Sequence, residues 1–345
     1  MKKTLVLLLF AVFTLVLIGC DSKKDDEEFQ VDVFIYNFAD TYIGGVRSVM
    51  EKELKNVEGV KFTFHDAANS QDTQSSQIDA AITKGTDLLV VNIVETGSGQ
   101  TVVDKAKKAK LPIIFFNREV SDAVVKSYDK AVFVGTDPDE AGYMQGEMIA
   151  DLLLAEGAYD KYDLNKDGKI SYIMLRADLD NPEANGRTTY SVNEANRLLT
   201  AAGKPALIQI GSDTNCSWDT ATAKTATASF LTSNTMGGDN PIELVIANND
   251  DMALGAIQAL NEVNYNTGNE TKILVVGVDA TATAQQAIKA NKMTGSIKQD
   301  GEAMAKCLVA MMTNTKNNKD FLNGLSYTFE KESDKVRIPY AKFLG

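Results

Sequence analysis

The sequence predicts an α/β protein of two domains built on parallel sheets. Short apolar runs rich in β-branched residues alternate with longer amphipathic segments, and this alternation is typical of βαβ units. The strand-like runs are apolar at nearly every position, which indicates sheets covered on both faces. A chain of 345 residues exceeds the size at which one hydrophobic core stops growing. We therefore expect two domains, with right-handed crossovers between their parallel strands.

The expected strands are the short apolar runs, and the expected helices are the amphipathic segments between them. The strand runs lie at 31–38, 60–65, 87–94, 111–117, 131–137, 170–175, 206–211, 242–249 and 273–279. The helical segments include 42–56, 72–84, 138–155, 219–232, 250–263 and 302–314. Their order along the chain predicts doubly wound sheets with helices on both faces.

The amino terminus has the pattern of an export signal. A short basic segment precedes an apolar run to Ile18, which is too short for a comfortable membrane span but fits the apolar core of a secretory signal. The run ends in Gly19-Cys20, which is similar to the lipobox of bacterial lipoproteins. We therefore predict that residues 1–19 are removed and that Cys20 is lipidated, with two or more acyl chains giving stable anchoring. An ordinary signal peptide is the alternative.

The segment after Cys20 and the net charge narrow the possible functions. Positions 21–28 hold no apolar residue, so residues 20–30 are predicted to form a solvated tether. The formal net charge is −12. Contacts with nucleic-acid phosphates require an excess of Lys and Arg, which this acidic chain lacks. Nucleic acid is therefore not an expected partner. A transcription regulator is a weak alternative, because it would also need a basic DNA-binding head.

The cysteines and the single histidine exclude several kinds of site. With Cys20 assigned to the anchor, we expect Cys216 and Cys307 to be buried free thiols, and a disulfide between them is the alternative. His65 follows a strand-like run and is expected to be structural. One histidine cannot supply a His-rich zinc site.

Polar residues stand at or just past the carboxyl ends of several expected strands. They are Asp40, Asn117, Asp137, Asn249 and Asp279. Ligands of open α/β sheets bind at this edge, but Asp and Asn also cap the helices that follow. Asp137 precedes Pro138 and is interpreted as a cap. For the other four residues both interpretations stay open.

Residues 163–171 have the spacing of a calcium-binding loop. The matching positions are Asp163, Asn165, Asp167, the turn residue Gly168, the main-chain carbonyl of Lys169, and Ser171. The position of the bidentate glutamate in an EF-hand is Met174, inside the next expected strand, so a carboxylate from elsewhere must complete the shell. The alternative is a solvated turn rich in Asp and Asn.

Ordered motifs along the chain resemble those of the periplasmic D-galactose/D-glucose-binding proteins of bacterial ABC transporters. The motifs are SYDKA and VGTD, DLNKDGKI, GRTTY, WDTATAK, VIANND and VGVDA. The resemblance covers roughly residues 31–340 and implies a type I periplasmic-binding-protein fold with three crossovers near 136, 299 and 335. The implied N-terminal lobe is 31–135 plus 300–334, and the implied C-terminal lobe is 136–299 plus 335–345.

The resemblance also implies a sugar site and completes the calcium set. The implied sugar-binding residues are Asp40, Tyr42, Asn117, Asn181, Glu183, Arg187, Trp218, Asn249, Asp279 and Gln299. Two of them, Tyr42 and Trp218, would stack on the two faces of a pyranose, while the polar groups bind its hydroxyls. The implied calcium ligands are Asp163, Asn165, Asp167, the Lys169 carbonyl, Ser171 and the distant Glu243.

Four positions depart from the family pattern. Asn181 and Glu183 stand where the family has His and Asp. Gln299 replaces an Asn, and Ser171 replaces a Gln. Because a site built for hydroxyl groups rejects analogues steeply when one polar partner is lost, the three differences in the sugar site leave the preferred hexose open. The shorter Ser171 concerns the calcium site, where a water would bridge to the ion and the affinity would be lower.

The resemblance implies a binding protein, not an enzyme, that closes on glucose or galactose outside the cytoplasmic membrane and delivers it to an ABC permease. We expect a monomer with a structural Ca²⁺, tied to the membrane by its anchor, and a chemoreceptor is a further candidate partner. The alternatives are a binding protein for another monosaccharide or related polyol, and a glycoside-acting enzyme with a carboxylate pair such as Asp40 and Asp279.

Overall fold

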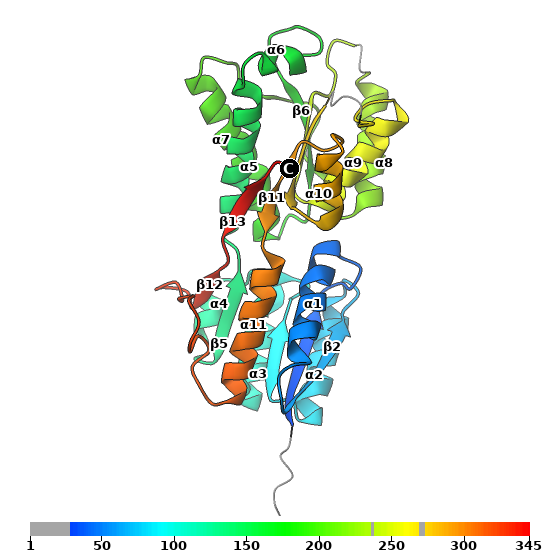
Figure 1. Cartoon of the computed structure of the whole chain (residues 1–345). Coiled ribbons are helices and arrows are strands. Elements are labelled where there is room, and N and C mark those ends of the chain that lie inside the picture. The colour runs from blue at the N-terminus through cyan, green and yellow to red at the C-terminus, as the bar shows by residue number, and fades with distance from the viewer. Residues whose placement is uncertain (1–27, 236–237, 269–272) are drawn as a thin grey trace, which may run out of the picture.

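The computed structural model describes residues 28–235, 238–268 and 273–345. This part of the chain forms two α/β lobes that stand end to end (Figure 1). The predicted signal, Cys20 and most of the predicted tether lie outside the described residues. Within the described residues, no helix is both long enough and apolar enough to cross a membrane.

The first lobe is built on a parallel sheet with the strand order β12-β5-β4-β3-β1-β2. Its strands are β1 (Phe29–Ile35), β2 (Val60–Asp66), β3 (Leu88–Val91), β4 (Ile113–Phe116), β5 (Ala131–Gly135) and β12 (Lys335–Arg337). Its helices are α1 (Thr41–Leu54), α2 (Gln71–Lys84), α3 (Gly99–Ala109), α4 (Asp122–Lys126) and α11 (Gly301–Lys316), with a 3-10 turn at Thr96–Ser98.

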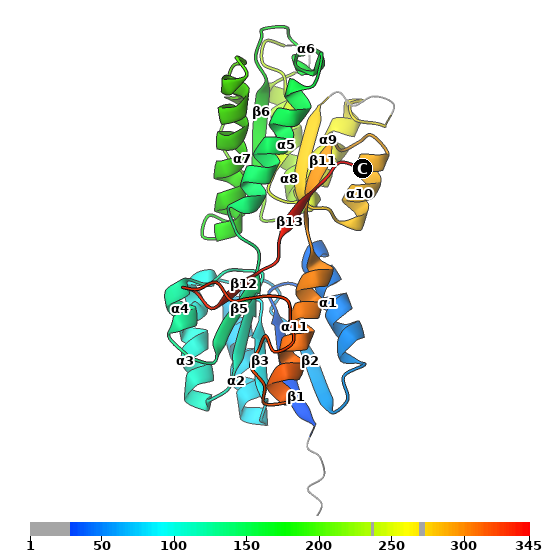
Figure 2. The same ribbon diagram turned by 60° about the vertical axis from the view of Figure 1, so that its left-hand side comes forward.

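Helices cover both faces of the first sheet (Figure 2). Val33 and Ile35 of β1 join the core under α1 and α11, whereas Phe34 joins the core under α2 and α3. Successive side chains of a strand point to opposite faces, so β1 must be apolar at both parities. This burial on two faces explains the nearly continuous apolar runs in the sequence.

The second lobe repeats this architecture with the strand order β13-β11-β10-β9-β6-β7, and β8 also pairs with β6. Its strands are β6 (Ser171–Arg176), β7 (Ile208–Gln209), β8 (Thr214–Asn215), β9 (Leu244–Ala247), β10 (Leu274–Asp279), β11 (Gly295–Gln299) and the antiparallel β13 (Tyr340–Phe343). Its helices are α5 (Glu140–Leu154), α6 (Ala158–Tyr162), α7 (Pro182–Ala201), α8 (Thr220–Ser233), α9 (Asp250–Glu262) and α10 (Ala282–Lys289).

Three crossovers join the lobes, and they lie side by side in both views (Figures 1 and 2). They connect β5 to α5, β11 to α11, and β12 to β13. The predicted third boundary at 335 was wrong: residues 335–337 form β12, which pairs in parallel with β5 of the first sheet. Lys335 and Val336 are buried there, so this crossover lies at 338–339. Likewise, residues 29 and 30 belong to β1 and not to the tether.

Every expected strand run contains a strand, but several helices were not expected. The clearest case is α7, whose buried face holds polar residues including Glu183, Arg187 and Thr188. A helix with a polar buried face has no amphipathic pattern to detect. Asp137 is also not a helix cap: its carboxylate accepts a hydrogen bond from the Asp139 N–H, and α5 begins at Glu140.

The expectations for His65 and for the two cysteines of the described residues are confirmed. His65 is structural: its Nε2 lies 2.6 Å from Asp32 Oδ1 and its ring stacks on Phe34. Cys216 and Cys307 are buried free thiols in different lobes. Burial raises their thiol pKa values to about 11 and about 12, respectively, so both stay protonated at neutral pH.

Candidate functional site

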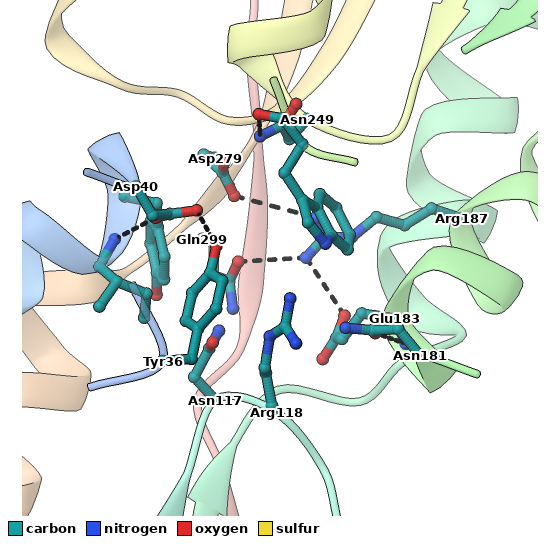
Figure 3. A pocket seen from close by; sticks show the side chains of 13 residues that line it. Tyr36, Asp40, Asn117, Arg118, Asn181, Glu183, Arg187, Asn249, Asp279 and Gln299 are labelled. Atoms are coloured by element: carbon teal, nitrogen blue, oxygen red, sulfur yellow. Dashed lines mark hydrogen bonds and ion pairs between the residues drawn. The ribbon is translucent and has the colours of Figure 1, made fainter. Parts of the chain in front are cut away.

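A pocket lies between the lobes, where the carboxyl ends of both sheets face each other (Figure 3). All ten predicted sugar-binding residues line this single pocket. They are Asp40, Tyr42, Asn117, Asn181, Glu183, Arg187, Trp218, Asn249, Asp279 and Gln299. Tyr36, Ile43 and Arg118 also line it, and the sequence analysis missed these three.

The wall from the first lobe is formed by the ends of β1 and β4. Asp40 caps α1, because its Oδ1 accepts a hydrogen bond from the Ile43 N–H at 2.7 Å, and its Oδ2 accepts one from the Tyr36 hydroxyl. Asn117 has a left-handed φ of 60°, and its Oδ1 accepts a bond from Asn92 at 3.1 Å. The cap and ligand interpretations are therefore compatible, since each side chain is fixed by one local bond and still faces the pocket.

Arg118 is a cationic wall residue that follows Asn117 directly. Its Nη1 donates to the Val94 carbonyl at 2.5 Å, and its guanidinium lies 3.9 Å from the centroid of the Tyr36 ring. These contacts hold the arginine flat against the pocket wall. A basic residue next to a polar strand end was a signal in the sequence that could have identified it.

The wall from the second lobe begins with two more helix caps. Asn181 caps α7, because its Oδ1 accepts hydrogen bonds from the Glu183 and Ala184 N–H groups. Asn249 caps α9 in the same way through the Met252 N–H. Both residues are about 4% exposed. Capping uses the side-chain oxygen, so the amide nitrogen is left to contact a ligand. In Asn249 one hydrogen of this nitrogen also donates to the Trp218 carbonyl at 3.5 Å.

Arg187 is at the centre of the second wall and is 3% exposed. Its Nη1 donates to the Asn248 carbonyl at 2.9 Å. Its Nη2 lies 3.2 Å from Glu183 Oε2, 3.1 Å from Gln299 Oε1 and 2.9 Å from the Tyr340 hydroxyl. Among the described residues, its buried Nε has no hydrogen-bond partner. A guanidinium has five N–H donors, so Nε and the second hydrogen of Nη1 stay available to a ligand.

Asp279 faces this arginine from the end of β10. Its Oδ1 is 3.9 Å from Arg187 Nη1, and its φ of 114° is strained for a residue with a side chain. Burial raises the pKa of Asp279 well above its ordinary value, Arg187 opposes this shift, and the neighbouring Asp250 adds to it. Asp250 lies behind the pocket, where its carboxylate accepts hydrogen bonds from the Ser296 hydroxyl and the Thr281 N–H.

The two aromatic residues come from opposite lobes. Trp218 is half-buried, has a left-handed φ of 63°, and has a buried Nε1 without a partner in the described part of the chain. Tyr42 is the second residue of α1 and packs against the start of α11 near Gly301. An apolar ring face from each lobe is therefore available at the pocket.

Glu183 and Gln299 occupy the back of the pocket, toward the crossovers. Glu183 Oε1 accepts a hydrogen bond from Thr136 at 2.7 Å, and its Oε2 faces Arg187 and Tyr340. Gln299 accepts a bond from Arg187 and donates one to Thr136. Their side chains already have partners within the protein, so sugar binding by these two residues stays a prediction.

The calcium-type loop is brought together with Glu243, which is 72 positions away from Ser171 in the chain. Glu243 Oε1 accepts a hydrogen bond from the Leu164 N–H, and Oε2 accepts one from the Ser171 N–H. Asp163 accepts bonds from the Asp167 and Gly168 N–H groups. The described residues contain no group of three or more His, Cys, Asp or Glu side chains arranged to hold a metal. A cation here would also need amide and main-chain oxygens.

Comparison with known proteins agrees with this architecture. Residues 31–320 match the family described as periplasmic binding protein domain. The D-galactose/methyl-galactoside binding periplasmic protein of Haemophilus influenzae is 34% identical over 340 residues, covering 99% of this chain and 96% of the relative. This similarity therefore extends over essentially the whole chain.

Solved structures give the same result. An ABC transporter solute-binding protein from Bacillus halodurans with bound myo-inositol has a TM-score of 0.72 and 25% identity, covering 93% of this chain and 96% of that one. One from Clostridium phytofermentans with bound β-D-glucose has a TM-score of 0.71 and 21% identity, covering 91% and 94%. These proteins bind solutes, and the glycoside-acting alternative finds no support among them.

The buried Asp250 makes a testable contribution to pH dependence. Burial raises its pKa from 3.8 to about 7, so the folded state holds this proton more tightly than the unfolded state. The free energy of unfolding should therefore fall as the pH rises from about 4 to about 7. Asp250→Asn removes the titrating group; its oxygen can accept from the Thr281 N–H and its amide nitrogen can donate to the Ser296 hydroxyl. It should therefore reduce this fall, as measured by urea unfolding at several pH values.

The control for this experiment is Asp160→Asn, which changes an exposed residue of α6. It should keep the pH dependence of the wild type. Equal pH dependence in the wild type and Asp250→Asn would contradict the assignment.

Proposed function

Because the chain belongs to the family of periplasmic binding proteins, we propose that it captures a hexose of the glucose or galactose kind between its lobes. The chain is an extracytoplasmic sugar-binding component of an ABC transporter, and its partner is the permease of that transporter. A chemoreceptor as second partner and a monomeric state stay predictions from the sequence.

The observation that supports a sugar best is the pairing of unused donors with acceptors in one buried pocket. Arg187 Nε and Trp218 Nε1 are buried donors without partners among the described residues, and unpaired buried donors are costly. Asp40 and Asp279 place carboxylates in the same pocket. A sugar hydroxyl both donates and accepts, so adjacent hydroxyls can satisfy an arginine and a carboxylate together.

The size and charge of the pocket narrow the ligand further. The cavity volume is about 40 Å³, so the lobes must separate to admit a sugar ring. The lining carboxylates of Asp40, Glu183 and Asp279 exceed the two lining arginines in number. A sugar acid or sugar phosphate would place its anionic group among these three carboxyl groups, so the lining favours a neutral sugar.

The proposal of glucose or galactose is supported by the ligands named for similar proteins. The Haemophilus protein is described as binding D-galactose and methyl-galactoside, and the Bacillus protein holds myo-inositol. Both ligands are six-membered rings that carry several hydroxyls. We therefore keep another monosaccharide or a cyclic polyol as the second candidate, because Asn181, Glu183 and Gln299 differ from the family pattern.

Binding couples to closure of the lobes because the pocket takes residues from both. Direct contacts between the lobes accompany the pocket. The Thr96 hydroxyl donates to the Asp180 carbonyl at 3.2 Å, and Arg118 lies 3.8 Å from Asp178. A ligand that contacts both walls stabilises the closed form over the open form, and hinge motion at the crossovers allows the exchange.

Sugar binding can be followed through Trp218, which is the only tryptophan. We expect D-glucose or D-galactose to change its fluorescence and to release heat in isothermal titration. Asp279→Asn should weaken the affinity by about 10- to 100-fold, as expected when a charge-assisted hydrogen bond is lost. A matched control is Asp213→Asn, which alters an exposed aspartate outside the pocket lining.

The control should bind like the wild type. The absence of heat with every hexose, pentose and cyclic polyol tried would refute the proposed ligand class.

A structural Ca²⁺ in the loop at 163–171 is a second part of the proposal. Asp163 and Glu243 are 5% and 1% exposed, and burial raises the pKa of Glu243 although hydrogen bonds from Ser171 and Leu164 oppose the shift. A cation would neutralise these two buried carboxylates and use oxygens of Asn165, Asp167 and Lys169. Ser171 fits less well, because its hydroxyl donates to the Pro241 carbonyl.

Removal of calcium should lower the stability of the second lobe. We expect EDTA to lower the melting temperature of the wild type and to have no effect on Glu243→Gln, which lacks one ligand charge. Glu262→Gln, which breaks only an exposed ion pair with Lys224, should respond to EDTA like the wild type. No response of the wild type would argue against the site.

Lipid attachment at Cys20 is the third part, and it rests on the sequence alone. Wild-type protein should sediment with membranes and incorporate labelled fatty acid. Cys20→Ala should lose both properties, whereas Cys307→Ala should keep them. Unlabelled wild-type protein in the soluble fraction would contradict anchoring.

A further inference from the structure

We propose that Tyr340 is a positioning residue for sugar binding, which fixes Arg187 by linking it to all three crossovers. The inference rests on the proposed function, because it assigns a role at the same site. Tyr340 is the first residue of β13, at the end of the third crossover, and is 6% exposed. It does not line the pocket.

The three crossovers meet in one buried group of polar side chains. One residue lies in or next to each crossover: Thr136 in the first, Gln299 at the end of β11 before the second, and Tyr340 at the start of β13 after the third. The Tyr340 and Thr136 hydroxyl oxygens are 2.9 Å apart, and Gln299 Nε2 donates to Thr136 Oγ1 at 3.2 Å. Thr136 and Gln299 are 0% and 3% exposed, so water does not compete for these bonds.

Two residues of α7 connect this group to the pocket. Glu183 accepts from the Thr136 hydroxyl through Oε1 and lies 2.9 Å from the Tyr340 hydroxyl through Oε2. Arg187 Nη2 donates to the Tyr340 hydroxyl at 2.9 Å and to Gln299 Oε1 at 3.1 Å. The bonds from Arg187 to Glu183 and Gln299 are visible in Figure 3.

Counting protons shows why the phenol matters. A tyrosine hydroxyl has one proton to donate and accepts through its lone pairs. The Tyr340 oxygen accepts from Arg187, so its proton goes either to Glu183 or to Thr136. Arg187 Nη2 has two hydrogens and three acceptors, so removal of the phenol oxygen would leave Glu183 and Gln299 as its acceptors. The main loss would be the link that ties Arg187 to the third crossover and fixes its position.

Arg187 directs one side of its guanidinium toward the crossovers and the other side toward the ligand. The Nη2 side faces the crossovers and is fully engaged, whereas Nε and one hydrogen of Nη1 are left for the ligand. A guanidinium is planar and rigid, so fixing Nη2 also fixes the direction of Nε. Hinge motion moves the crossovers, and the same bonds therefore couple the direction of Nε to closure of the lobes.

The test compares two variants that each remove one buried phenol hydroxyl. Tyr340→Phe removes the oxygen at the crossovers. The control, Tyr172→Phe, removes a hydroxyl that lies 3.2 Å from Gln209 in the second lobe, away from the pocket. Both are made in the full-length protein and measured by titration with D-glucose, D-galactose and myo-inositol, and by thermal unfolding without sugar.

We expect Tyr340→Phe to weaken binding of the best ligand by about 10- to 100-fold, the effect of losing a hydrogen bond to a charged group. Tyr172→Phe should keep the wild-type affinity. Equal affinity of Tyr340→Phe and wild type would overturn the inference, and so would a lower melting temperature of Tyr340→Phe with unchanged affinity. Wild-type protein that binds none of the three ligands would refute the proposed function instead.

A second variant covers the case in which Tyr340→Phe does not fold. Thr136→Val keeps the shape of the side chain and removes the hydroxyl that joins Glu183, Gln299 and Tyr340. It should also weaken sugar binding, and combined with Tyr340→Phe its effect should be smaller than the sum of the two single effects, because both act on one network. Wild-type affinity of Thr136→Val would overturn the inference.

Discussion

Burying the guanidinium of Arg187 is the constraint on which the site and its surroundings depend. A charge removed from water is tolerated only when acceptors surround it in good geometry. Burial lowers the pKa of Arg187, but Glu183 and Asp279 more than reverse this effect and keep the side chain cationic. Its acceptors come from α7, β9, β10 and the crossovers, so the folding of the whole second lobe is needed to assemble them.

Three helices begin at the pocket, and their capping residues line it. Asp40, Asn181 and Asn249 each use one oxygen to cap a helix, and this bond fixes the orientation of the rest of the side chain. A fixed polar group loses little conformational entropy when a ligand arrives. The question of cap or ligand, which the sequence left open, is therefore not a choice between exclusive roles.

Much of the fold and of the candidate site could be predicted from the sequence. Apolar runs such as 87–94 and 242–249 predicted strands correctly, because a strand that is buried on both faces is apolar at nearly every position of its sequence. Polar strand ends and the resemblance together identified ten of the thirteen residues that line the pocket. Sequence reasoning failed where no local pattern exists. The helix α7 is polar on its buried face, β12 is a short edge strand, and Tyr340 meets Thr136 only through pairing over 204 positions.

The proposed function requires that a single hexose lies between the lobes in contact with both. A crystal structure of the mature protein grown with its best-binding hexose would test this most directly. We predict one pyranose between Tyr42 and Trp218, with hydroxyls on Arg187 Nε and on the Asp40 and Asp279 carboxylates. A pocket that holds only water at saturating sugar, or a sugar that contacts one lobe alone, would contradict the claim.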